Sequence, residues 1–234
     1  MDTLIIEKKN EVYITVDCDP NIQREISEFF TFYVPGYKFM PAFRNRMWDG
    51  KIRLYSQKTK EIYFGLFPYI RAFAEERGYQ IVSGEDVEIN NKVDKEIVKK
   101  FSNSLGQKFE ARDYQIDAIY HSLKFNRALL LSPTASGKSF IIYSLIRYYS
   151  HLIKDSLNNR ILLIVPTTSL VEQMYSDFQS YGWNVKKNCH RLYSGYSNQT
   201  DKKVLISTWQ SLYKLPKKYF EQFGVVFGDE AHLF

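Results

Sequence analysis

The chain has 234 residues, of which 44% are hydrophobic and 25% are charged, and its formal net charge is +6. This composition is typical of a globular protein of one or two domains and excludes a disordered chain. Apolar stretches end well before the roughly 20 residues of a membrane helix, and no secretory signal opens the chain. We therefore expect a cytoplasmic protein with no membrane partner. Cys18 and Cys189 lie far apart, which indicates neither a disulfide framework nor a zinc site.

In chain order, the sequence predicts strands at 4–6 and 12–16, a helix at 22–32, a hairpin or small antiparallel sheet within 37–66, a helix at 67–77 closed by Gly78, and a connecting helix at 93–101. These elements predict a small α+β domain at residues 1–90 and a linker at 91–105. Strand and helix signals alternate over residues 106–234, which predicts an α/β domain with a parallel sheet.

The positive charge is unevenly distributed along the chain. Residues 1–105 carry 16 Lys and Arg against 16 Asp and Glu, whereas residues 106–234 carry 16 against 10. Within the neutral first part, residues 38–60 are nonetheless rich in basic and aromatic side chains. We expect this segment to bind nucleic acid through phosphate contacts and packing on sugars or bases, although a solvated strand face is the alternative. The expected contacts are Arg44, Arg46, Trp48, Lys51 and Arg53.

A loop between a predicted buried strand at 127–131 and a predicted helix from residue 140 has the pattern of a phosphate-binding loop. Its residues are Ser132, Pro133, Thr134, Ala135, Ser136, Gly137, Lys138 and Ser139. Small residues let backbone N–H groups converge on phosphate oxygens at a helix N-terminus. Lys138 is expected to reach the β- and γ-phosphates, and Ser139 to bind magnesium. Ser132 departs from the pattern, which usually opens with Gly.

An acidic pair supplies the second half of this predicted site. Asp229 and Glu230 follow the apolar run 223–228, which predicts a buried parallel strand and places both carboxylates at its C-terminal end. There Asp229 is expected to hold magnesium, and Glu230 to orient or deprotonate the attacking water.

Polar residues also stand at the other predicted strand and helix ends. Gln115, in a helix that opens at 112–119, offers the donor and acceptor that match adenine. Predicted strands at 161–165 and 204–206 each run into a helix start that carries hydroxyl groups, which suits contact with DNA phosphates. The expected DNA contacts here are Pro166, Thr167, Thr168, Gln173, Gly195, Thr208, Gln210 and Ser211.

Taken in order, the motifs at 112–119, 132–139, 166–168, 208–211 and 229–232 resemble the first half of a superfamily-2 helicase core of the DEAH-box type. Segments 43–44 and 48–54 are similar to the small leading domain of phage recombination-repair helicases. The resemblance implies an α/β fold in which a RecA-like parallel sheet follows a small α+β nucleic-acid-binding domain. It also assigns Arg112 and His232 to the nucleotide site.

The resemblance further implies ATP and Mg²⁺ as cofactors and double-stranded or branched DNA as the partner, with RNA–DNA hybrids as a further candidate. The implied activity is junction migration, rescue of replication forks and R-loop unwinding, in the host cytoplasm beside phage recombination and single-strand-binding proteins.

The resemblance stops at the acidic motif, residues 229–232, which we call the acidic box. We therefore expect a first motor lobe without the second lobe and its arginine fingers. These residues alone are then expected to show little ATP turnover. Two alternatives stay open: the motor portion of a restriction-type nuclease, and a non-catalytic DNA-binding fragment. Residues 1–105 show no cluster of carboxylates and Lys in the spacing of a metal nuclease, which disfavours the first alternative.

Overall fold

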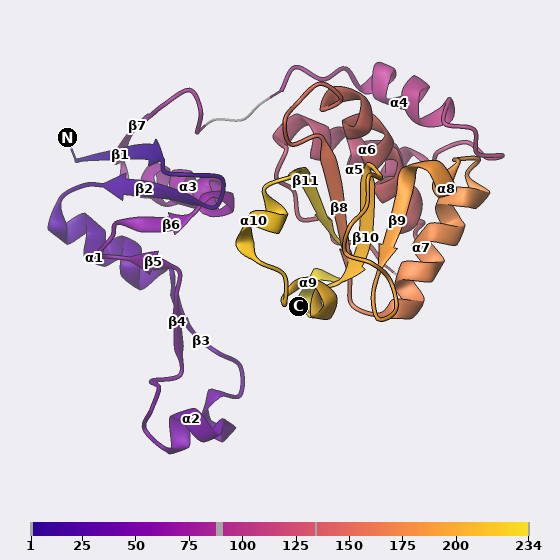
Figure 1. Ribbon diagram of the computed structural model, residues 1–234. Coiled ribbons are helices and arrows are strands. Elements are labelled where there is room, and N and C mark those ends of the chain that lie inside the picture. Colours follow the sequence, from indigo (N-terminus) through magenta and orange to yellow (C-terminus); the bar gives the residue numbers. More distant parts are fainter. Residues whose placement is uncertain (1, 88–90, 134, 234) are drawn as a thin grey trace. The chain divides into compact units, whose positions relative to one another are not determined.

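The computed structural model describes residues 2–87, 91–133 and 135–233. The chain divides into two compact units, Met1–Asn90 and Asn91–Phe234 (Figure 1). No helix among the described residues combines the length and the hydrophobicity that crossing a bilayer requires.

The first unit is a small α+β unit. Its elements are β1 (Thr3–Lys8), β2 (Tyr13–Asp17), α1 (Pro20–Phe29), β3 (Thr31–Tyr33), the 3-10 turn η1 (Tyr37–Phe39), α2 (Pro41–Arg44), β4 (Lys51–Arg53), β5 (Tyr55–Ser56), β6 (Glu61–Tyr63), η2 (Phe64–Leu66), α3 (Phe67–Arg77) and β7 (Gln80–Ser83). Five strands form one sheet in the order β5-β6-β2-β1-β7, in which β1 pairs antiparallel with β2 and parallel with β7.

The core of this unit lies on one face of that sheet. Alternate residues of β1, Leu4 and Ile6, are fully buried, whereas Ile5 between them is exposed, as the period of two in a strand requires. Helices α1 and α3 supply the opposing apolar side chains, among them Ile26 and Ile70. Helix α3 ends as the sequence predicts, because Gly78 adopts a left-handed conformation with φ of 70°.

The segment after α1 corrects two predictions. Helix α1 ends at Phe29, not at residue 32, because Thr31–Tyr33 forms a strand that pairs with Lys51–Arg53. The expected hairpin region is also partly helical, since η1 and α2 lie between these two strands. Figure 1 shows β3 and β4 as a narrow two-stranded ribbon that projects from the sheet of this unit and carries α2 at its far end.

The second unit is an α/β unit with a parallel sheet. Its elements are α4 (Lys95–Asn103), α5 (Asp113–Phe125), α6 (Lys138–Leu152), β8 (Arg160–Val165), α7 (Thr168–Ser180), α8 (Val185–Asn188), β9 (Cys189–Leu192), β10 (Val204–Thr208), α9 (Trp209–Leu212), α10 (Lys217–Phe220), β11 (Phe223–Gly228) and η3 (Ala231–Leu233). The strand order is β11-β8-β10-β9, and all of these pairs are parallel.

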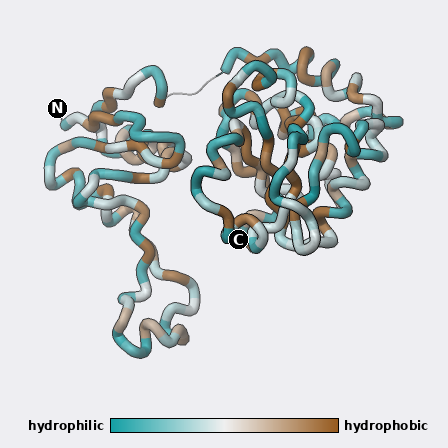
Figure 2. The backbone as a smooth tube through the Cα atoms, in the orientation of Figure 1, coloured by the Kyte–Doolittle hydropathy of each residue, from teal (hydrophilic) through white to brown (hydrophobic). Residues whose placement is uncertain are grey.

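Helices cover both faces of this sheet. Ile161, Leu163 and Val165 of β8 belong to the core formed with α5, α6 and α7. Leu162, from the other face of the same strand, packs with Leu212 at the end of α9 and with side chains of α10. The strands of this sheet are accordingly among the most hydrophobic segments in Figure 2, which is typical of a parallel sheet covered by helices on both sides.

Three expectations for this unit need correction. The run 127–131 forms no strand, and its Leu129 and Leu131 are largely exposed. Strand β11 does form, but it pairs only with β8 among the described strands, and Val226 is exposed at this sheet edge. Helix α4, expected as a helix that connects the two domains, belongs to the second unit, because its Val98 is buried in the core of that unit. For residues 127–131 and for β11, hydrophobicity predicted burial, whereas the available sheet partners decided it.

Candidate nucleotide and nucleic-acid sites

The phosphate loop ends at the N-terminus of α6, which begins at Lys138. Gly137 precedes the helix with φ of 78°, and Ala135 also has a positive φ of 63°. Left-handed residues between helical ones turn successive N–H groups toward one side, as a phosphate site requires. The Phe140 N–H donates to the Gly137 carbonyl at 3.0 Å. The N–H groups of Lys138 and Ser139 precede it, where a helix offers no carbonyl four residues back, and they face the expected anion. Thr134, also expected to bind nucleotide, lies outside the described residues.

Gln115 joins α5 to this loop. Its side-chain oxygen accepts a hydrogen bond from the Arg112 N–H at 3.0 Å, and its Nε2 donates to the Ser136 carbonyl at 3.1 Å. The hydroxyl of Tyr114 donates to the same carbonyl at 2.9 Å, and the Arg112 guanidinium donates to that hydroxyl at 3.0 Å. Gln115 is buried. Its amide therefore fixes the shape of the loop, and its expected contact with adenine stays a prediction.

Lys138 and Glu230 form an ion pair and a hydrogen bond that join the phosphate loop to the acidic box. The hydrogen bond from Lys138, followed by its charge, lowers the pKa of Glu230. The His232 ring lies 3.6 Å from the other oxygen of this carboxylate. The pair forms at the C-terminal edge of the sheet, where the Asp229 N–H donates to the Ile164 carbonyl at 2.9 Å as β11 ends.

The oxygen ligands expected for magnesium are Asp229 and Ser139. Asp229 is buried, which raises its pKa, and the charge of Lys138 opposes that rise. Ser139 Oγ lies 2.9 Å from the Tyr181 hydroxyl. A hydroxyl and a buried carboxylate fit magnesium, which takes few protein ligands and keeps water and phosphate oxygens. Among the described residues, no three His, Cys, Asp or Glu side chains are grouped to hold a metal by themselves.

The two strand-to-helix junctions expected to contact DNA lie at one edge of the sheet, because β8 and β10 are parallel and Thr208 lies opposite Val165. Their residues are not equally accessible. Thr167, Thr168, Gln173, Gly195 and Gln210 are exposed, and Ser211 is partly buried. Pro166 and Thr208 are buried. The prediction that the Thr208 hydroxyl is exposed is therefore wrong. That hydroxyl lies 3.0 Å from Ser211 Oγ at the start of α9, where it has a structural contact.

The basic segment of the first unit lies on the β3–β4 ribbon and the lobe at its end, which we define as residues 37–50. Arg44 and Arg46 are exposed in this lobe. Trp48 is half-buried, and its Nε1 donates to the Lys51 carbonyl at 2.9 Å. Arg53 is engaged with Asp49, whose pKa it lowers. The Lys51 ammonium lies 4.9 Å from the centre of the Tyr33 ring.

Two residues of the nucleotide site were absent from the predicted set. Tyr114 contacts the loop backbone, and Tyr181 contacts Ser139. Tyr114 stands beside Gln115, so its position in the motif was an available signal. Tyr181 lies 42 residues from Ser139, and no spacing rule connects the C-terminal end of α7 to the phosphate loop.

Comparisons with known proteins identify the family and the fold. The family model described as the res subunit of type III restriction enzymes matches residues 108–234, and the model described as the N-terminal region of the DNA helicase UvsW matches residues 5–84. The ATP-dependent DNA helicase uvsW of Enterobacteria phage T4 is 35% identical over 230 residues, which are 94% of this chain and 45% of that protein. The chain thus spans less than half the length of this relative.

Two crystal structures of UvsW from bacteriophage T4 have the same fold as this chain, each with a TM-score of 0.85. One is 31% identical and is matched over 100% of this chain and 84% of its own length. The other is 32% identical and is matched over 99% of this chain and 48% of its own length.

Proposed function

The chain belongs to the family of superfamily-2 helicases that contains UvsW, and from this premise we propose that it is the ATP-binding and DNA-binding part of an ATP-dependent DNA helicase. The observation that carries the proposal is the contact between Lys138 and Glu230. It joins two motifs that are 92 residues apart in the sequence. A phosphate-binding lysine beside an acidic pair is what binding and hydrolysis of a nucleoside triphosphate require.

In this proposal, the Lys138 ammonium would leave Glu230 and bind the β- and γ-phosphates of ATP. The first N–H groups of α6 would bind the same phosphates. Release from the lysine leaves Glu230 to orient a water molecule. Ser139 and Asp229 supply oxygen ligands for Mg²⁺. When bound, ATP and Mg²⁺ supply the phosphoanhydride bond and the positive charge that stabilises its cleavage.

The adenine side of the nucleotide site is the helix start at Arg112. Gln115 still has one amide hydrogen and one lone pair beyond its two hydrogen bonds to the backbone, so it can contact adenine without releasing the loop. Arg112 is exposed beside it. His232 follows the acidic pair and is assigned to the phosphate side through its contact with Glu230.

The proposed substrate is double-stranded or branched DNA, with RNA–DNA hybrids included. The exposed residues at the sheet edge would follow one strand, and the basic lobe would contact a duplex. The likeness to a phage ATP-dependent DNA helicase supports DNA unwinding as the activity. Within that activity we propose junction migration, fork rescue and R-loop unwinding, with recombination and single-strand-binding proteins as partners in the host cell.

The test is magnesium-dependent ATP binding, followed by hydrolysis in the presence of a branched DNA, for the chain and its Lys138→Ala variant. We expect the variant to lose at least about 100-fold in ATP affinity, since a charged phosphate contact is removed. Lys154→Ala, an exposed lysine after α6, is the matched control and should bind as the unmodified chain does. Equal ATP affinity for all three proteins would contradict the proposed site.

A second candidate is the motor of a restriction-type nuclease, because the family model described as the res subunit covers the second unit. The match of residues 5–84 to a helicase N-terminal region favours the helicase instead. DNA cleavage that co-purifies with the chain and needs Mg²⁺ would reverse this preference.

A further inference from the structure

The lobe at residues 37–50 presents large apolar side chains to solvent. Phe39 is 84% exposed and Met47 is 82% exposed, and both fall in the segment between β3 and β4. Two large apolar side chains so exposed within one short basic segment mark a candidate contact surface.

The lobe has an internal framework that does not use these two side chains. The Tyr33 and Tyr37 rings stack with centroids 4.7 Å apart, and Tyr37 meets the edge of Phe43 at 4.8 Å. Gly50 has φ of 79°, and a Cβ at this position would lie 2.3 Å from the Tyr37 ring. This close approach holds the returning chain against the aromatic stack. Phe39 and Met47 are thus presented on a packed support and are not needed to form it.

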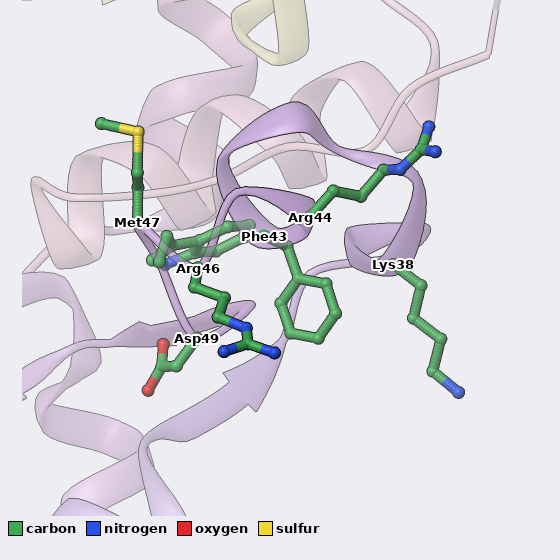
Figure 3. A pocket seen from close by; sticks show the side chains of 7 residues that line it. Lys38, Phe43, Arg44, Arg46, Met47 and Asp49 are labelled. Carbon is green, nitrogen blue, oxygen red and sulfur yellow. The ribbon is translucent and has the colours of Figure 1, made fainter.

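The same lobe is rich in basic side chains, and three of them lie around a pocket that Met47 also lines. Lys38, Arg44, Arg46 and Met47 line a pocket in this lobe together with Phe43, Trp48 and Asp49. Figure 3 shows the Lys38, Arg44 and Met47 side chains extending outward in different directions. Asp49, the acidic residue of the lobe, is paired with Arg53. The net positive charge of the lobe therefore favours a polyanionic partner. Such a partner covers the exposed Phe39 and Met47 side chains only if it also has apolar surfaces.

A nucleic acid offers such faces where base stacking is interrupted. In a continuous duplex the base faces are covered, and the accessible edges are largely polar. At an end or a branch point the base faces open, and the cost of unstacking is lowest there. We propose that Phe39 and Met47 pack against exposed base faces at an end or branch point of a nucleic acid, while Lys38, Arg44 and Arg46 bind the flanking phosphates. This inference rests on the proposed function and names the feature of the substrate that the lobe binds.

The test compares the full chain with a Phe39→Ala/Met47→Ala variant on a three-way DNA junction and on a relaxed, covalently closed circular duplex, which has neither an end nor a branch point. Alanine substitution of a side chain that stacks on a base weakens binding, so we expect roughly tenfold weaker junction binding and less than twofold change on the closed duplex. A 2-aminopurine at the branch point should lose its protein-induced fluorescence change. The slope of log affinity against log salt should stay the same, because no cation is removed.

Tyr69→Ala is the control, since Tyr69 is a 61% exposed aromatic of α3 outside the lobe; it should leave binding to both DNAs unchanged. Equal junction binding by the double variant would overturn the inference, and so would an equal loss on both DNAs. A dimeric chain that becomes monomeric in the double variant would also overturn it, because a second copy would then cover the pair. If the unmodified chain binds neither DNA, the proposed function itself fails.

Discussion

The two predicted binding regions differ in how their charged groups are satisfied. In the nucleotide site, Lys138 is bound to Glu230, Ser139 to Tyr181 and Gln115 to the loop backbone. In the lobe of the first unit, Arg44 and Arg46 are exposed, and no ion pair is recorded for either within the described residues.

This difference determines which existing contacts a ligand must replace when it binds. ATP must replace contacts that the nucleotide site already makes with itself, so internal bonds set part of its affinity. In the lobe, a nucleic acid would bind Arg44 and Arg46 without first replacing an ion pair. Its affinity should therefore depend chiefly on the number of phosphate contacts and on the salt concentration.

Reversing both free arginines, Arg44→Glu with Arg46→Glu, should weaken DNA binding roughly 100-fold and make the salt slope shallower by about 2, since two phosphate contacts are removed. ATP binding should not change. Fluorescence anisotropy at several salt concentrations measures both quantities. Lys99→Glu with Lys100→Glu reverses two exposed charges on α4 and is the charge-matched control. A similar loss in the control would mean that net charge, and not the lobe, determines affinity.

Gly137→Ala should destabilise the second unit by about 2 kcal/mol. A side chain at φ of 78° is strained, and its Cβ would lie 2.4 Å from Gln115 Nε2, which is already bonded to the loop. Urea denaturation measures the change. Gly195→Ala is matched, because its φ is 93° and no atom lies within 4 Å of the new Cβ. If both variants lose the same stability, Gln115 does not brace the loop.

Tyr181→Phe should cost about 1 kcal/mol or less of stability, the usual net value of one hydrogen bond, and should strengthen Mg·ATP binding slightly. The reason is that Ser139 no longer has to leave the Tyr181 hydroxyl. Tyr149→Phe is the control: it removes a hydroxyl of α6 that donates to Asn126, the residue after α5, at 3.0 Å, and it should affect stability alone. Weaker ATP binding by Tyr181→Phe would show that its hydroxyl supports Ser139 instead of competing for it.

The smallest expected effect is a change in pH dependence on Lys138→Ala. Lys138 lowers the pKa of Glu230 and opposes the rise at Asp229, so in the variant both pKa values should move upward. A lowered folded-state pKa gives stability above the unfolded value, which is lost as the pH falls through the folded value. The stability advantage of the unmodified chain should thus be largest at neutral pH and shrink below the ordinary Glu value of 4.5. An advantage that grows on acidification would contradict the pairing; carboxyl carbon titration by NMR measures each group.

Local signals in the sequence predicted elements of both units correctly. Strand β8 and the end of α3 at Gly78 follow from apolar runs and a helix-stop glycine, which act over a few residues. The run 127–131 had the same apolar signal as β8 but forms no strand. A strand also needs a hydrogen-bonding partner, and local hydrophobicity carries no information about that partner.

The sequence by itself determined the residue types of the nucleotide site, because phosphate, magnesium and water chemistry each demand particular groups at the ends of strands and helices. Tertiary structure alone decided which of them meet. It paired Lys138 with Glu230, buried Thr208, brought Tyr181 to Ser139 and left Phe39 exposed. These outcomes depend on packing between segments far apart in the chain, and such contacts follow from how whole elements fit together.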